Sequence, residues 1–107
     1  MKIEVLYVPD CPYHPAAVLK LREVLAAEGV VADISEVAVK DMATAKALRF
    51  CGSPTIRVNG RDVAAESGSI QDFAVSCRLY PGSKKPGVPP TEMIRRAVRD
   101  ARVADHP

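Results

Sequence analysis

The most constraining feature of this chain is a strand pattern that leads directly into a helix pattern and then into a second strand pattern. Residues 3–8 form a short segment rich in apolar and β-branched side chains, which is typical of a strand. After a turn marked by prolines, residues 14–28 repeat apolar side chains at helical spacing, and Gly29 ends that pattern. Residues 30–39 then have the apolar character of a buried strand. The sequence therefore predicts a right-handed β-α-β unit with parallel strands.

A shorter helix and a hairpin are predicted next. Asp41 is a suitable N-cap for a short helix, which the run Gly52-Ser53-Pro54 breaks. Residues 55–58 have a strand pattern, and the Asn59-Gly60 dipeptide that follows is the strongest hairpin signal in the chain. Residues 61–64 are therefore predicted to begin an antiparallel partner strand.

The last third of the chain has a weaker pattern until its final helix. Residues 65–73 are predicted to be irregular, and residues 74–80 to form a short edge strand. Residues 81–90 contain four prolines and two glycines, which predicts a loop. Residues 91–103 have a helical apolar stripe. The predicted order is β-α-β-α-β-β-α with a late loop insertion, which gives one α/β domain over residues 1–107 with helices on both faces of a mixed central sheet.

Charge, hydropathy and cysteine spacing exclude several classes of function. The formal net charge of +2 is too small to favour a nucleic-acid partner. No apolar run approaches the roughly 20 residues that a membrane span needs, and no secretory signal pattern is recognisable. The three cysteines lack the paired spacing of a disulfide framework or a structural zinc site. We therefore expect a cytoplasmic protein with reduced thiols, no resident metal or cofactor, and no membrane partner.

Topology places one of these cysteines where α/β proteins carry their sites. In open α/β sheets, ligands bind outside the carboxyl ends of the parallel strands. Cys11 follows the first predicted strand and precedes the first predicted helix. The unpaired N–H groups and the positive dipole end at a helix start stabilise a thiolate relative to a thiol. Cys11 is therefore the leading candidate nucleophile.

The segment Cys11-Pro12-Tyr13-His14 resembles the Cys-Pro-Tyr-Cys active site of glutaredoxins, with His14 in place of the second cysteine. The resemblance implies thiol-disulfide chemistry at Cys11, with His14 beside it and with Pro12 and Tyr13 against the substrate. A two-cysteine exchange within the motif is excluded because the resolving cysteine is missing. A single-thiol reaction remains, with glutathione as co-substrate or with another cysteine of the chain as partner. His14 either favours the Cys11 thiolate when protonated or is a solvent-facing helix residue.

A second motif, Ser53-Pro54-Thr55, resembles the loop of thioredoxin-like proteins in which a cis proline faces the reactive thiol. The resemblance implies that these three residues shape the substrate groove. Because both motifs fall in corresponding elements, the chain resembles the thioredoxin-like and glutaredoxin-like superfamily, which implies a thioredoxin-like three-layer sandwich. Residues 49–63 and 76–80 also resemble small uncharacterised bacterial thioredoxin-like proteins that are sometimes labelled alkylmercury lyase.

The two remaining cysteines have different expected roles. Cys51 lies three residues before Pro54, and in the thioredoxin-like fold this loop runs close to the reactive thiol. Cys51 is therefore either the internal redox partner of Cys11 or a small apolar residue that closes the second helix. Cys77 follows an alternating stretch and is expected to be structural.

Two functions follow from these residues. The first is a thiol-disulfide oxidoreductase-like protein that acts on disulfides or glutathione adducts of a small molecule or a protein. The second is a non-catalytic thioredoxin-fold binding module that carries a soft metal of the mercury type, a small thiol or a protein partner. The sequence leaves the oligomeric state open, a homodimer included.

Overall fold

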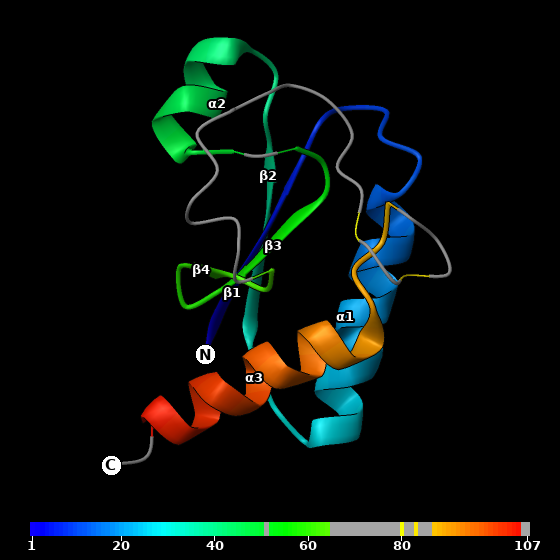
Figure 1. Cartoon of the computed structure of the whole chain (residues 1–107), viewed down its shortest axis with the longest axis vertical. Coiled ribbons are helices and arrows are strands. Elements are labelled where there is room, and N and C mark those ends of the chain that lie inside the picture. Colours follow the sequence, from blue (N-terminus) through cyan, green and yellow to red (C-terminus); the bar gives the residue numbers. More distant parts are fainter. Residues whose placement is uncertain (51, 65–79, 81–82, 84–86, 106–107) are drawn as a thin grey trace.

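The computed structural model describes residues 1–50, 52–64, 80, 83 and 87–105, and within them seven helices and strands follow the predicted order (Figure 1). Their bounds are β1 (Lys2–Tyr7), α1 (His14–Glu28), β2 (Asp33–Ala38), α2 (Met42–Leu48), β3 (Thr55–Val58), β4 (Arg61–Asp62) and α3 (Thr91–Asp105). None of these helices is long and apolar enough to cross a membrane.

The strands form one mixed sheet in the order β2-β1-β3-β4. β1 is parallel to β2, with Ile3 opposite Ile34, and antiparallel to β3, with Leu6 opposite Thr55. β3 in turn is antiparallel to β4. This arrangement confirms the predicted α/β class, a mixed sheet with its parallel pair at one side.

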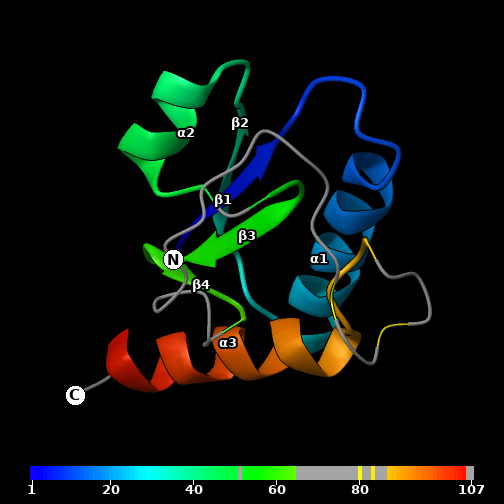
Figure 2. The ribbon, with the colours of Figure 1, turned by 45° about the horizontal axis from the view of Figure 1, so that its top comes forward.

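Helices cover both faces of the sheet, because alternate residues of each strand point to opposite sides. α1 and α3 lie side by side on one face, and α2 lies on the other (Figure 2). The larger core cluster, between the sheet and the pair α1 and α3, contains Ile3, Val5, Ala17, Leu21, Val24, Leu25, Ile56, Val58, Val63, Val88, Ile94 and Val98. The smaller cluster under α2 contains Leu6, Val39, Ala45 and Phe50.

Several element boundaries agree with those expected from local sequence signals. α1 spans the predicted residues and ends at Gly29, which has φ 65°. The side chain of Asp41 caps α2 by accepting a 2.7 Å hydrogen bond from the Thr44 N–H. Asn59 and Gly60 both have positive φ, as the hairpin turn requires.

Other boundaries differ from the prediction, each for a local reason. The strand predicted from residue 30 begins at Asp33, because the Val30 N–H still binds the Leu25 carbonyl at the end of α1. α2, by contrast, ends at Leu48, the last residue expected in that helix, because Arg49 adopts a left-handed conformation and Arg57 binds the freed carbonyl of Leu48.

The later part of the chain also departs from the sequence-based boundaries. β4 has two residues rather than the four of the predicted strand 61–64, and α3 extends to Asp105 rather than ending at residue 103. Tyr80 lies outside any strand. The predictions for residues 65–79 lie outside the described residues, as does half of the predicted loop 81–90; its described residues, 83 and 87–90, lie outside any helix or strand.

Candidate functional site

The candidate site is the turn between β1 and α1, at the carboxyl end of the parallel pair. The Cys11 N–H donates to the Val8 carbonyl at 3.0 Å, and the His14 N–H donates to the Cys11 carbonyl at 3.3 Å. The N-cap of α1 is Tyr13, which makes no side-chain capping hydrogen bond. Cys11 is therefore part of a hydrogen-bonded turn just before the helix, and it is a free thiol.

The N–H groups near this thiol are fewer than at an ordinary helix start. Pro12 and Pro15 have no backbone N–H to donate. The His14 N–H already binds the carbonyl of Cys11. The stabilisation of a thiolate by free helix N–H groups, expected from the sequence, is therefore smaller here.

The second motif lies directly beside the end of β1. Leu6 pairs with Thr55 in the antiparallel register, and two residues further on the Val8 N–H donates to the Ser53 Oγ at 2.9 Å. The peptide bond between Ser53 and Pro54 is cis. The fold thus brings together the segment that leads into Cys11 and the loop around Pro54, two parts of the chain that are more than 40 residues apart in sequence.

The side chains of this loop face the protein interior. Ser53, Pro54 and Thr55 are all buried. The Thr55 hydroxyl donates to the Gly52 carbonyl at 2.6 Å, and the buried Tyr80 hydroxyl donates to the Pro54 carbonyl at 2.5 Å. In this structure the loop is therefore a buried support beside the turn, with the Gly52 and Pro54 carbonyls bound by Thr55 and Tyr80.

The candidate nucleophile is also covered, since Cys11 is only 8% exposed. Nearby, the segment that leads into α3 contacts the motif tyrosine. A Cβ atom added to Gly87 would lie 2.1 Å from Cδ2 of Tyr13 and 2.2 Å from its Cγ, so only glycine fits against the ring. Gly87 was not among the residues predicted for the site, because its only signal in the sequence is a glycine within a proline-rich stretch.

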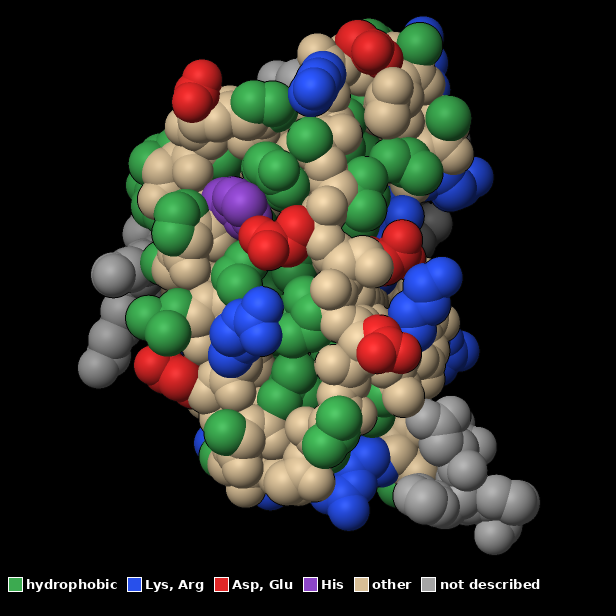
Figure 3. Space-filling model, turned by 180° about the vertical axis from the view of Figure 1, so that it is seen from behind, with side chains coloured by type: hydrophobic (Ala, Val, Ile, Leu, Met, Phe, Trp, Pro, Cys, Tyr) green, Lys and Arg blue, Asp and Glu red, His purple; other side chains and the backbone are tan. Residues whose placement is uncertain are grey.

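His14 has a defined position that the sequence did not predict. Its ring stacks on that of Tyr7, with 3.8 Å between centroids and an interplanar angle of 6°. Its Nε2 lies 2.6 Å from Oε1 of Glu36 on β2. Figure 3, which shows the back of the molecule, has the purple imidazole against a red carboxylate at the surface. With 20% of its side chain exposed, His14 belongs to a three-residue cluster rather than facing solvent freely.

Tyr7 and Glu36 could have been found from strand alternation combined with a correct register. Glu36 pairs with Val5, a residue of the α1-facing core cluster, so Glu36 also points toward α1. Cys51 and Cys77 lie outside the described residues. The predicted pairing of Cys51 with Cys11, its alternative role at the end of the second helix, and the predicted structural role of Cys77 therefore lie outside them too. Within the described part of the chain, no group of three His, Cys, Asp or Glu side chains could hold a metal ion.

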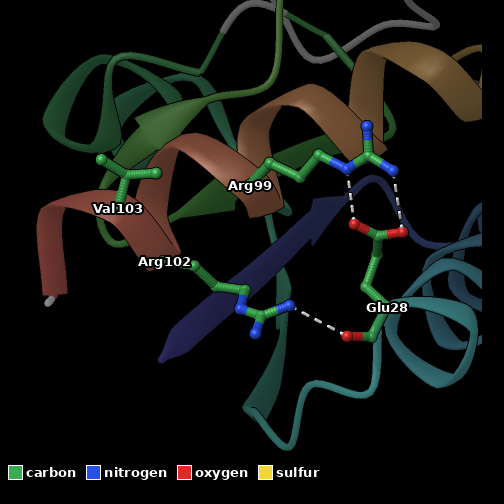
Figure 4. A pocket seen from close by; sticks show the side chains of 4 residues that line it. All are labelled: Glu28, Arg99, Arg102 and Val103. Carbon is green, nitrogen blue, oxygen red and sulfur yellow. Dashed lines mark hydrogen bonds and ion pairs between the residues drawn. The ribbon is translucent and has the colours of Figure 1, made fainter.

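A shallow hollow at the other end of α1 contains paired charges (Figure 4). Its lining is Glu28, Arg99, Arg102 and Val103. Nε of Arg99 lies 2.7 Å from Oε1 of Glu28, and Arg102 donates to the Glu28 backbone carbonyl at 3.1 Å. The hydrogen bond from Arg99 holds the pKa of Glu28 below its ordinary value. Because α1 has 15 residues, about 20 Å long, this hollow is remote from Cys11.

No family model, curated protein or solved structure matches the chain.

Proposed function

We propose that this protein has a thioredoxin-like fold and acts as a thiol-disulfide oxidoreductase that uses Cys11 as its single motif thiol. The observation that carries this proposal is the 2.9 Å hydrogen bond between the Val8 N–H and the Ser53 hydroxyl. It joins the segment before Cys-Pro-Tyr-His to the Ser-Pro-Thr loop, so that the two motifs form one site at the carboxyl end of β1. That is the edge where open α/β sheets bind their ligands.

The reaction follows from the chemistry of a single thiolate. The sulfur of Cys11 attacks one sulfur of a substrate disulfide, forms a mixed disulfide and releases the other half as a thiolate that takes up a proton. The thiolate of glutathione then attacks the substrate sulfur of the mixed disulfide, which frees Cys11. Because Cys11 is 8% exposed, a small disulfide or glutathione adduct fits this site better than a folded protein.

A binding module without turnover is the second candidate, and it has an observation of its own. The residue at the position of the missing cysteine, His14, is held by Glu36 and Tyr7. A covered thiol with no second motif cysteine is suited to retaining a soft metal ion such as mercury(II), or a small thiol that it takes from a disulfide by exchange while the other half leaves as a thiol. Under this second proposal, Cys11 forms a lasting adduct and glutathione does not release it.

The deciding experiment follows glutathione-dependent reduction of a small mixed disulfide by the reduced protein. We expect wild type to turn over and Cys11→Ser to be inactive, with Cys77→Ser as the matched control that removes a cysteine outside both motifs. A Cys51→Ser variant tests the internal partner, because it lowers activity only if Cys51 resolves the adduct. Inactive wild type that binds mercury(II) through Cys11 would favour the binding module instead.

A further inference from the structure

The Tyr7, His14 and Glu36 side chains form a cluster on the α1 side of the sheet. The parallel pairing of β1 and β2 places Glu36 beside Val5. Because side chains alternate between the two faces along a strand, Tyr7 points to the same face as Val5. The stacking of the His14 ring on Tyr7 and the 2.6 Å contact of its Nε2 with Glu36 restrain both the position and the rotation of the imidazole. The ring is therefore fixed from two strands before any substrate arrives.

The carboxylate of Glu36 determines which ring nitrogen of His14 carries the proton. An ionised carboxylate only accepts hydrogen bonds, so Nε2 of His14 must carry the proton that Glu36 accepts. In the neutral ring this leaves the lone pair on Nδ1, the nitrogen nearer to the backbone.

Cys11 lies in the same turn as this imidazole. The hydrogen bond from the His14 N–H to the Cys11 carbonyl closes a four-residue turn, in which the end Cα atoms are less than about 7 Å apart. Tyr7 and Glu36 contact the ring, Cys11 and Tyr13 are the other titratable residues of the turn, and Asp10 directly precedes it. Of these two contacting residues, Glu36 is the one that accepts a hydrogen bond from the ring through a carboxylate.

We propose that Glu36 is a positioning residue, which orients His14 to exchange a proton with the thiol of Cys11. The proton of the Cys11 thiol passes to Nδ1 of His14 and leaves a thiolate beside an imidazolium. After the thiolate attacks the substrate disulfide, the imidazolium returns that proton to the departing thiolate, which leaves as a thiol. This inference rests on the proposed function, because it supplies the proton for the same reaction.

The test measures the rate of Cys11 alkylation by iodoacetamide across pH, resolved by mass spectrometry, in the full-length protein. We expect Glu36→Gln and His14→Gln each to slow alkylation at pH 7 by about three- to eightfold. Removing the negative charge of Glu36 would by itself stabilise a nearby thiolate and speed alkylation. A slower rate in Glu36→Gln would therefore result from the changed position of His14. In the His14→Gln background, Glu36→Gln should then have no further slowing effect.

Glu4→Gln is the matched control, because Glu4 lies on the neighbouring strand but on the opposite face of the sheet. It should alkylate like wild type. A second readout, the ¹⁵N shifts of the His14 ring in wild type and Glu36→Gln, should report a protonated Nε2 that depends on Glu36. This measurement needs no reaction at Cys11. If the wild-type shifts showed the mixture of Nδ1- and Nε2-protonated forms of a histidine without a hydrogen-bond partner, the proposal would be overturned.

The outcomes separate this inference from the function on which it rests. If Cys11 is activated in wild type but Glu36→Gln alkylates at the same rate, the inference fails and the proposed function stands. If Glu36→Gln slows alkylation equally with and without His14, Glu36 does not act through the imidazole. If wild-type Cys11 reacts like an ordinary thiol, with half-maximal rate near pH 8.5, both proposals fail.

Discussion

The two ends of α1 are stabilised in opposite ways. At the C-terminal end, Gly29 closes the helix in a left-handed conformation, and Arg99 and Arg102 from α3 bind Glu28. At the N-terminal end, Tyr13 caps the helix without a side-chain hydrogen bond, and the first helical residue, His14, is bound by side chains of the sheet. The C-terminal end thus binds a neighbouring helix, and the N-terminal end binds the sheet.

This difference is consistent with the chemical role that we propose for the Cys11 end. The carboxylate and guanidinium groups at the Glu28 end satisfy one another, so little reactive capacity is left there. The Cys11 end instead combines a covered free thiol with an oriented imidazole. We therefore expect substitutions at the Glu28 end to change stability alone, and substitutions at the Cys11 end to change both stability and thiol reactivity.

The largest effect is expected at Gly87, which supports the Cys11 end. Gly87→Ala would place a Cβ 2.1 Å from the Tyr13 ring, and no positive φ adds to the strain. Overpacking of this kind costs about 1–3 kcal/mol of unfolding free energy, which chemical denaturation measures. Because the ring must move, the rate of Cys11 alkylation should change as well. Wild-type stability together with a wild-type rate would show that the loop does not constrain Tyr13.

Gly29→Ala probes the opposite end of the helix and should have a smaller effect. Gly29 has φ 65° and open space around its Cα, so the cost comes only from a left-handed alanine, about 1 kcal/mol. The unfolding free energy should fall by that amount while Cys11 alkylates at the wild-type rate. A changed alkylation rate would contradict the separation of the two ends.

The sequence predicted the fold more fully than the site. The helix from His14 to Glu28, its stop at Gly29 and the turn at Asn59-Gly60 were read from local patterns, because each depends on residues close together in the chain. Residue 30 was wrongly assigned to a strand, since its hydrogen bond to the Leu25 carbonyl depends on how the helix ends in three dimensions.

For the candidate site, the predicted topology and the two motifs singled out Cys11 and the Ser53 loop. They did not predict the residues that contact His14. The contact with Glu36 joins residues 22 apart in sequence, and it depends on the parallel register of β1 and β2. An error of one residue in that register would place Glu36 on the other face. The contact of Gly87 with Tyr13 likewise needs the packing of the segment before α3, which no periodic pattern encodes.

The ion pairs at the Glu28 end make stability depend on acid pH. The hydrogen bond with Arg99 lowers the pKa of Glu28 in the folded state, so its stabilisation is complete above the ordinary carboxyl value. It is lost as the pH falls through the lowered folded-state pKa. Wild type should therefore exceed Glu28→Gln in melting temperature at pH 7, with the difference shrinking toward pH 2. A difference that does not change with pH would mean that the charge of Glu28 contributes nothing.

The smallest effect is expected for Glu92→Gln, which removes a neighbouring charge without touching the Glu28 end directly. Glu92 pairs with Arg95 on α3, but its side chain is 77% exposed, and exposed pairs of this kind contribute about 0–1 kcal/mol. Arg95 also approaches Glu28 at 3.8 Å, so it keeps a partner when Glu92 is neutral. Chemical denaturation should therefore give nearly the wild-type unfolding free energy. A decrease in unfolding free energy as large as that of Gly29→Ala would mean that Glu92 helps to orient the arginines. The interactions that stabilise the Glu28 end would then extend along α3 beyond the residues that contact Glu28.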